Sequence, residues 1–143
     1  MGDLLTALAA AQPDKTAIVD DRTAMTGTDA VRRCTYAEFE DRANQLAHVL
    51  DGLGVGPSDK VVWCGQNSTG ILELTSASRK IGSTAVPLNY RLSDEEAAYV
   101  IDHCDATTVY IDAEFADLVR RVRSEIPKVA NVLVFDGDAP DGM

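Results

Sequence analysis

The residues best suited to chemistry are three consecutive side chains, Asn89, Tyr90 and Arg91. They follow an apolar run that ends in Pro87-Leu88, and they precede a segment that opens with a helix-capping pattern. A carboxamide, an aromatic ring and a guanidinium together offer hydrogen bonds, stacking and a positive charge. We predict that these three residues lie next to a substrate or cofactor. The alternative is that Tyr90 packs in the core and Arg91 caps nearby carbonyls.

A glycine-flanked loop at residues 65–70 is a second candidate. Its sequence, Gly-Gln-Asn-Ser-Thr-Gly, has the glycine spacing that begins a phosphate-binding loop. The lysine and the serine or threonine that such a loop needs are replaced by Ile71 and Leu72. We therefore favour an ordinary strand-to-helix turn, with Ser68 as the helix cap, over a nucleotide phosphate site. The sequence also lacks the Gly-x-Gly-x-x-Gly pattern of dinucleotide-binding domains.

The sequence gives little support for nucleophilic catalysis or for a metal site. The only histidines, His48 and His103, are too isolated for a Ser-His-Asp triad, and no serine elbow is visible. Cys34, Cys64 and Cys104 are widely spaced and form no Cys-x-x-Cys pair, so neither a zinc site nor a disulfide framework is indicated. We expect no catalytic residue and no metal site here, and apolar cysteines typical of a reducing cytoplasm.

Length and charge narrow the class of protein further. The chain has 143 residues, of which 45% are hydrophobic, enough for one domain with its own core, and we assign residues 1–143 to a single α/β domain. Lys plus Arg number 13 and Asp plus Glu number 23, a net charge of −10 that argues against nucleic-acid binding through a basic face. No apolar run approaches the roughly 18 residues of a transmembrane helix.

Short apolar runs rich in β-branched residues predict the strands that must position these side chains. They lie at residues 60–64, 84–88, 107–111 and 131–135. Helical patterns fill the gaps, at residues 68–81, 93–104 and 113–125. This spacing is too long for hairpins and fits βαβ crossovers, so we predict a three-layer α/β fold whose mostly parallel sheet has helices on both faces. The loops at 65–70, 89–92 and 112–114 then share one edge, where α/β sheets bind ligands.

The first third of the sequence predicts a different local structure. Leu4, Leu5 and Leu8 suggest a short amphipathic helix, followed by a strand at residues 16–20. Residues 21–33 read as a loop or hairpin leading to a brief strand near residues 33–35. A Thr-x-x-Glu capping box then opens a helix whose apolar stripe runs from Tyr36 to Leu53.

Several local details can be checked in the structure. Gly82 should end a helix with a positive φ, and Asp112 should cap the helix at 113–125. The acidic, Gly- and Pro-containing tail at residues 136–143 should be flexible. The inward face of the helix at 68–81 should carry its apolar side chains: Ile71, Leu72, Leu74, Ala77 and Ile81.

Three stretches resemble motifs of the acyl-adenylate-forming (AMP-binding) enzymes. Thr-Tyr-Ala-Glu-Phe at 35–39, followed by Ala-Asn-Gln-Leu-Ala at 43–47, resembles their opening motif. Residues 54–61 resemble the usual connection to the next strand. Residues 79–89 resemble the second motif, in which a helix ends at glycine and a strand at Pro-x-Asn. The ending Pro-Leu-Asn-Tyr-Arg-Leu at 87–92 is most similar to fatty acyl-CoA synthetases.

The resemblance runs from about Thr16 to Phe135 and departs mainly in the long segment 21–33. It implies the N-terminal portion of a fatty-acid–CoA ligase, which joins a fatty acid to ATP as an acyl-adenylate and passes the acyl group to CoA with the help of Mg²⁺. The phosphate loop, the ribose-binding aspartate and the catalytic lysine of such enzymes come after the matched portion.

Three expectations follow from the resemblance. This chain alone should hold no cofactor and should be inactive, while ATP, Mg²⁺, CoA and fatty acid serve the parent enzyme. Apolar surface that later segments would cover should make the fragment a homo-oligomer. The alternative from another class is a stand-alone α/β module that binds a partner and catalyses nothing.

Overall fold

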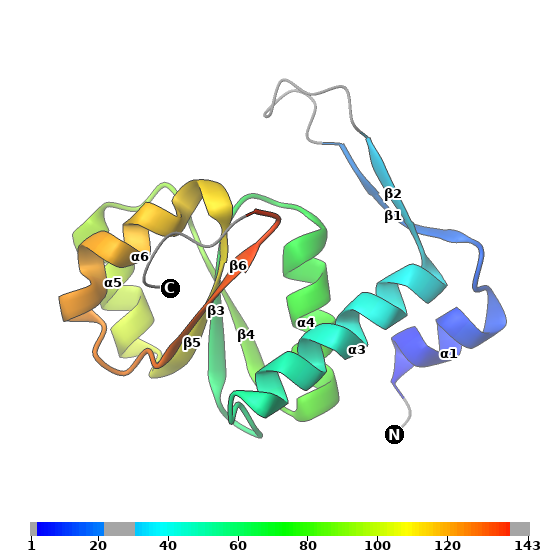
Figure 1. The fold of residues 1–143 in the computed structure, drawn as a ribbon, viewed down its shortest axis with the longest axis horizontal. Helices are drawn as coiled ribbons and strands as arrows, with labels where there is room; N and C mark the ends of the chain where they lie inside the picture. The colour runs from blue at the N-terminus through cyan, green and yellow to red at the C-terminus, as the bar shows by residue number, and fades with distance from the viewer. Residues whose placement is uncertain (1–2, 22–30, 138–143) are drawn as a thin grey trace.

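The computed structural model describes residues 3–21 and 31–137 (Figure 1). In the first part of the chain the elements are α1 (Leu4–Ala11), β1 (Thr16–Asp20), β2 (Arg32–Thr35), α3 (Tyr36–Gly52), β3 (Lys60–Cys64) and α4 (Thr69–Ile81). In the second they are β4 (Thr84–Leu88), α5 (Asp94–His103), β5 (Ala106–Asp112), the 3₁₀ turn Ala113–Phe115, α6 (Ala116–Val122), the 3₁₀ turn Arg123–Glu125 and β6 (Asn131–Phe135).

Four strands form a parallel sheet in the order β4-β3-β5-β6. Alternate residues of β3 face opposite sides. Val62 and Cys64 pack with α5 and α6, whereas Val61 and Trp63 pack with α3 and α4. Helices therefore cover both faces, as Figure 1 shows, and the predicted three-layer α/β fold is confirmed.

A separate hairpin, β1 with β2, extends from this body (Figure 1). Its strands are antiparallel, with Thr16 opposite Thr35 and Asp20 opposite Arg32. Both predicted strands are confirmed, whereas residues 22–30 of the predicted loop lie outside the described residues. So do residues 138–143 of the tail that we expect to be flexible.

The capping patterns that mark helix starts in the sequence are confirmed. Thr35 and Glu38 form the reciprocal capping box of α3, and Ser93 with Glu96 forms the same arrangement at α5. Ser68 accepts a hydrogen bond from the amide of Gly70 at the start of α4. Each contact satisfies amides that would otherwise lack a partner in the first helical turn.

Two local predictions are wrong. The side chain of Asp112 makes no capping hydrogen bond, and the segment expected to be one helix is α6 with a 3₁₀ turn at each end. Without a side-chain cap at Asp112, the first turn tightens to a 3₁₀ turn. Leu72 and Leu53, expected on inward faces, are 44% and 41% exposed. Consecutive helical residues point about 100° apart, so Leu72 cannot share the face of Ile71.

Gly82 ends α4 with φ +78°, as predicted, and we expect Gly82→Ala to lower the free energy of unfolding by about 1 kcal/mol. The left-handed conformation, not space, sets the cost, because an added Cβ would be 3.5 Å from Pro57. Urea unfolding measures it. Gly52→Ala is the matched control, since Gly52 has no positive φ and open space around it. Equal effects of the two substitutions would contradict the prediction.

In the described ranges no helix combines the length and the apolar character needed to cross a membrane.

Candidate functional site

A cleft of about 440 Å³ opens where β3 and β4 end, at the carboxyl edge of the sheet. Its lining residues are Trp63, Gly65, Asn67, Ile71, Pro87, Leu88, Asn89 and Tyr90. The walls are thus mainly apolar and aromatic, with two carboxamides and no charged side chain among the lining residues. Such a surface suits an uncharged, flat or aliphatic part of a ligand.

A second cleft of about 440 Å³ lies on the other side of the start of α4, against β1. It shares Asn67 and Ile71 with the first cleft and adds the carboxylates of Asp20 and Asp21. The loop at 65–70 and the first turn of α4 therefore contribute lining residues to both clefts. A substitution of Asn67 or Ile71 would change the lining of both clefts.

The structure brings Asn89, Tyr90 and Arg91 together at this edge. Asn89 Oδ1 accepts a hydrogen bond from the Arg91 amide at 3.1 Å, which closes a tight turn. The Tyr90 ring lies 5.0 Å from that of Phe115, and the Arg91 guanidinium lies 5.2 Å from the Tyr90 ring centroid. Asn89 and Tyr90 line the cleft, whereas Arg91 is not among its lining residues.

The glycines at both ends of the 65–70 loop are required by Trp63. A Cβ on Gly65 would lie 2.5 Å from the indole, and a Cβ on Gly70 would lie 2.6 Å from it. The indole itself is only 2% exposed and packs edge-on against Tyr110 and Phe135. The phosphate-loop spacing in the sequence therefore reflects the packing of a tryptophan.

The start of α4 already holds an anion of the chain itself. Asp20 Oδ2, at the end of β1, accepts a hydrogen bond from the Thr69 amide at 3.1 Å, and Asp20 is 7% exposed. A helix N-terminus attracts phosphate through its free amides and its dipole, and here the carboxylate takes that place. Sequence reasoning missed Asp20, although an aspartate at a strand end is a usable signal.

The loops that follow β3 and β5 are joined directly. Gln66 Nε2 donates a hydrogen bond to Glu114 Oε1 across the point where the strand order reverses. In open α/β sheets this reversal point is the usual ligand crevice, and here the Gln66–Glu114 hydrogen bond spans it. Gln66 Oε1 and Thr69 Oγ1 are buried and have no hydrogen-bond partner among the residues that the structure describes, so each can still accept one.

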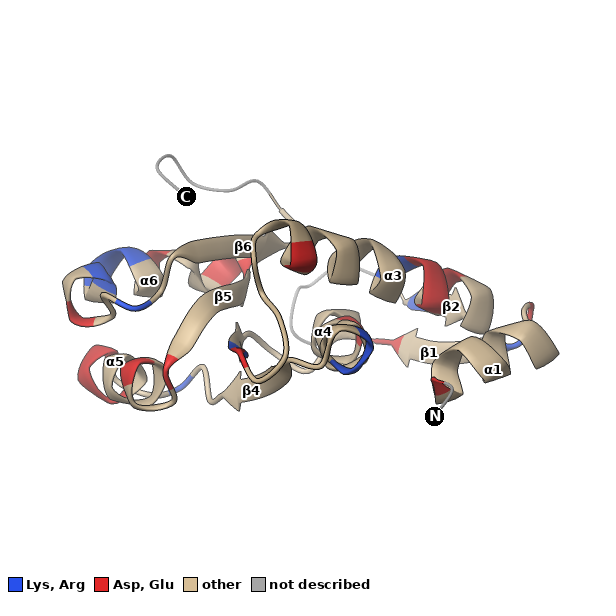
Figure 2. Cartoon of the chain, turned by 90° about the horizontal axis from the view of Figure 1, so that it is seen from below, with Lys and Arg blue, Asp and Glu red and all other residues tan. Residues whose placement is uncertain are grey.

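Neither cleft fits the phosphates of ATP or a magnesium ion. Among the described residues that line the two clefts there is no lysine or arginine. Figure 2 shows Lys and Arg positions spread over several elements, among them α6 and α4. No group of three or more His, Cys, Asp or Glu within the described residues could hold a metal ion. Charge on a triphosphate needs cations and free amides, and the residues present do not supply them.

A buried carboxylate lies deeper in α4, at Glu73. It is 6% exposed, and Arg42 of α3 approaches it at 3.3 Å. Burial raises the pKa of Glu73 above its usual 4.5, and the partner Arg42 offsets only part of that effect. Since the folded pKa lies above the unfolded one, Glu73 stabilises the fold most at low pH.

We expect the free energy of unfolding to fall as pH rises from about 4.5 through the raised pKa of Glu73. In Glu73→Gln this part of the pH dependence should be absent, because an amide does not ionise. Urea unfolding at several pH values measures the difference between the two proteins. The exposed Glu125→Gln serves as control and should keep the wild-type profile. Parallel profiles for wild type and Glu73→Gln would contradict the assignment.

The comparisons with known proteins agree on one family. A family model described as AMP-binding enzyme matches residues 5–142. A long-chain-fatty-acid–CoA ligase of Thermus thermophilus is 36% identical over 115 residues, which cover 80% of this chain and 21% of that protein. A 3-oxocholest-4-en-26-oate–CoA ligase of Rhodococcus rhodochrous is 35% identical, over 73% of this chain and 19% of that protein.

A solved structure agrees with the sequence matches. The Mycobacterium tuberculosis fatty acyl CoA synthetase superposes with a TM-score of 0.81 at 26% identity, over 96% of this chain and 28% of that one. The chain thus spans about a fifth of the length of the curated relatives it matches.

Proposed function

Because the chain belongs to the AMP-binding enzyme family, we propose that it is the N-terminal portion of a fatty-acid–CoA ligase. The observation that carries this proposal is the match over residues 5–142, together with relatives whose names share a CoA ligase activity. Their acids differ, a long-chain fatty acid in one and a sterol-derived acid in the other. The CoA-ligase class therefore has more support than the particular acid.

The proposed reaction has two steps, both performed by the whole protein. The fatty-acid carboxylate attacks the α-phosphorus of ATP and pyrophosphate leaves; the CoA thiol then attacks the acyl carbonyl and AMP leaves. Mg²⁺ would assist the first step by neutralising phosphate charge. The clefts described above supply none of that charge, so we assign the phosphate chemistry to segments outside this chain.

For the residues of this chain we propose a binding role. Asn89 and Tyr90 line the uncharged cleft, and Arg91 lies against the Tyr90 ring at its rim. These three residues would contact a part of the substrate or of CoA that carries no phosphate, through amide hydrogen bonds and ring stacking. No residue of this chain is proposed to take part in a proton or group transfer.

The test is CoA-dependent release of AMP by a longer product of the same gene, with long-chain fatty acids and a sterol side-chain acid as substrates. We expect release with fatty acids, and a raised KM for fatty acid or CoA in Tyr90→Ala. Tyr99→Ala is the matched control, because Tyr99 is 65% exposed on α5 and lines neither of the two clefts. No release with any acid would favour the alternative of a stand-alone binding module.

We also propose that the isolated chain self-associates and that it resides in the cytoplasm. Val19, Val31 and Leu72 are exposed apolar side chains on the hairpin segments and on α4, and β4 and β6 are open sheet edges. Multi-angle light scattering should report a dimer or larger species. A stable monomer at high concentration would contradict the association.

A further inference from the structure

The helix α1 is attached to the body by few contacts. Leu5 is its only buried residue, and Leu4 is 67% exposed. Just after the C-terminal end of α1, the backbone carbonyl groups of Pro13 and Lys15 accept hydrogen bonds from the amides of Ala37 and Tyr36 in α3. These two bonds fix the chain directly after α1 to the start of α3.

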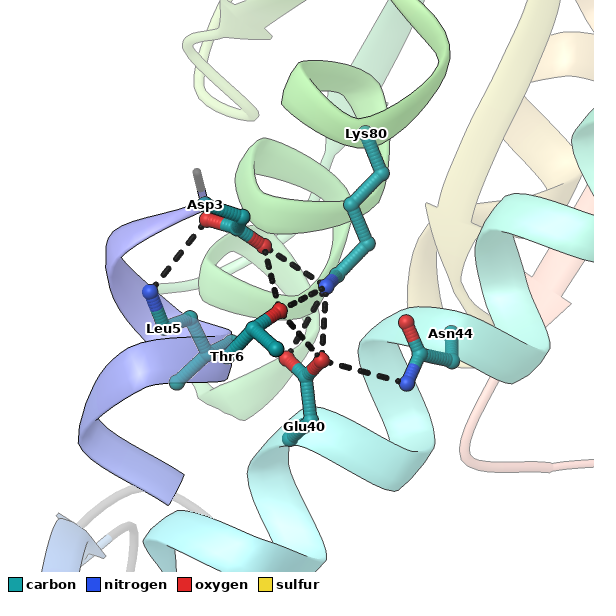
Figure 3. Close-up of polar contacts among 6 residues, drawn as sticks. All are labelled: Asp3, Leu5, Thr6, Glu40, Asn44 and Lys80. Atoms are coloured by element: carbon teal, nitrogen blue, oxygen red, sulfur yellow. Dashed lines mark hydrogen bonds and ion pairs between the residues drawn. The ribbon is translucent and has the colours of Figure 1, made fainter. Parts of the chain in front are cut away.

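At the other end of α1, one ammonium group joins three helices (Figure 3). Lys80 Nζ, in the last turn of α4, lies 2.6 Å from Asp3 Oδ2 and 2.9 Å from both carboxylate oxygens of Glu40 on α3. It also contacts Thr6 Oγ1 at 3.2 Å. The side chains of Lys80 and Glu40 are only 14% and 13% exposed, so solvent screens this group less than a surface pair.

From this geometry we infer that α1 can detach from the domain while the rest of the domain stays folded. The contacts of Lys80 with Asp3 and Glu40, called the latch below, hold α1 in place. Asp3, the cap of α1, and Glu40 on α3 are two carboxylates that share this cation, and the Thr6 hydroxyl of α1 also donates a hydrogen bond to Glu40 Oε1 at 2.7 Å. Without that cation they would repel each other and also lose a charge-assisted hydrogen bond each. The helices α3 and α4 stay together in either state, since buried Leu50, Leu74 and Ala77 join them in the core.

Two features of the latch support this reading. The hydrogen bond from Lys80 is the main cause that lowers the pKa of Asp3 below its usual range. Asp3 also caps α1, accepting a hydrogen bond from the Leu5 amide at 3.2 Å. The same side chain therefore starts the helix and fastens it to α4.

Hydrogen–deuterium exchange measured by mass spectrometry tests the inference. In Lys80→Met, we expect the amides of residues 7–12 to exchange about tenfold faster, with α3 and α4 unchanged. Asp3→Asn should accelerate the same amides to a smaller extent, because asparagine remains a good helix cap but loses the charge. Lys128→Met is the matched control. Lys128 also faces two aspartates, Asp102 and Asp105, but makes no contact with α1.

Unchanged exchange in residues 7–12 of Lys80→Met would overturn the inference. So would faster exchange spread equally over α3 and α4, because the lysine would then stabilise the whole domain and not one helix. If Lys80→Met does not fold, Asp3→Asn decides the question. A folded Asp3→Asn protein with wild-type exchange in residues 7–12 would equally overturn it.

Discussion

Trp63→Ala is expected to lower the free energy of unfolding by about 3–5 kcal/mol. The indole is 2% exposed and lies on β3, one of the two central strands of the sheet. Its ring centroid is 5.3 Å from that of Tyr110 and 5.7 Å from that of Phe135, both edge-on. Alanine would remove these contacts and leave a cavity under α4.

Urea unfolding of purified protein measures this loss. Tyr99→Ala is the control for removal of an aromatic ring, and because Tyr99 is exposed it should change stability by about 0.5 kcal/mol or less. A Trp63→Ala protein as stable as Tyr99→Ala would show that the indole does not hold this part of the core.

The same tryptophan explains the glycine spacing, and a double-mutant cycle separates this explanation from a phosphate-loop role. Gly70→Ala alone should cost about 1–3 kcal/mol, because its Cβ would overlap the indole. Combined with Trp63→Ala, the added methyl group would enter the vacated space, and its cost should fall to what the 3.0 Å approach to Phe135 imposes. An unchanged cost in the double variant would mean that something other than Trp63 requires glycine at this position.

Much of the fold can be predicted from the sequence, because its local signals agree with one another. The strands at 60–64, 84–88 and 131–135 have bounds that follow from short apolar runs between turn residues. The capping boxes at Thr35 and Ser93 set the starts of α3 and α5. Because the strands alternate with helices, crossover connections join them, and such connections place the strands parallel in one sheet.

The candidate site is less predictable, because its contacts join residues far apart in sequence. The carboxylate of Asp20 accepts a hydrogen bond from the Thr69 amide, 49 residues away. Outside the site, the contact of Lys80 on α4 with Asp3 at the start of α1 is equally long-range in sequence. No local pattern marks such pairs. The loop at 65–70 shows that a local pattern can also mislead. Its glycine spacing matches a phosphate loop, but the close approach of the Trp63 indole is what excludes larger residues at both glycines.

The second large expected effect concerns activity: the 143-residue chain alone should show no adenylate formation. The step brings a fatty-acid carboxylate to the α-phosphate while pyrophosphate leaves, so several negative charges must be neutralised at once. The described residues that line the two clefts include no lysine or arginine, and Asp20 already occupies the start of α4. The net charge of −10 repels ATP further.

ATP–pyrophosphate exchange with long-chain fatty acids measures the adenylation step by itself, because it does not require CoA. We expect no fatty-acid-dependent exchange from the purified chain of residues 1–143, and robust exchange from a longer product of the same gene. A folded chain confirmed by circular dichroism serves as the control for the negative result. Exchange catalysed by residues 1–143 alone, or its absence from the longer product, would contradict the assignment of this chain as the N-terminal portion of a fatty-acid–CoA ligase.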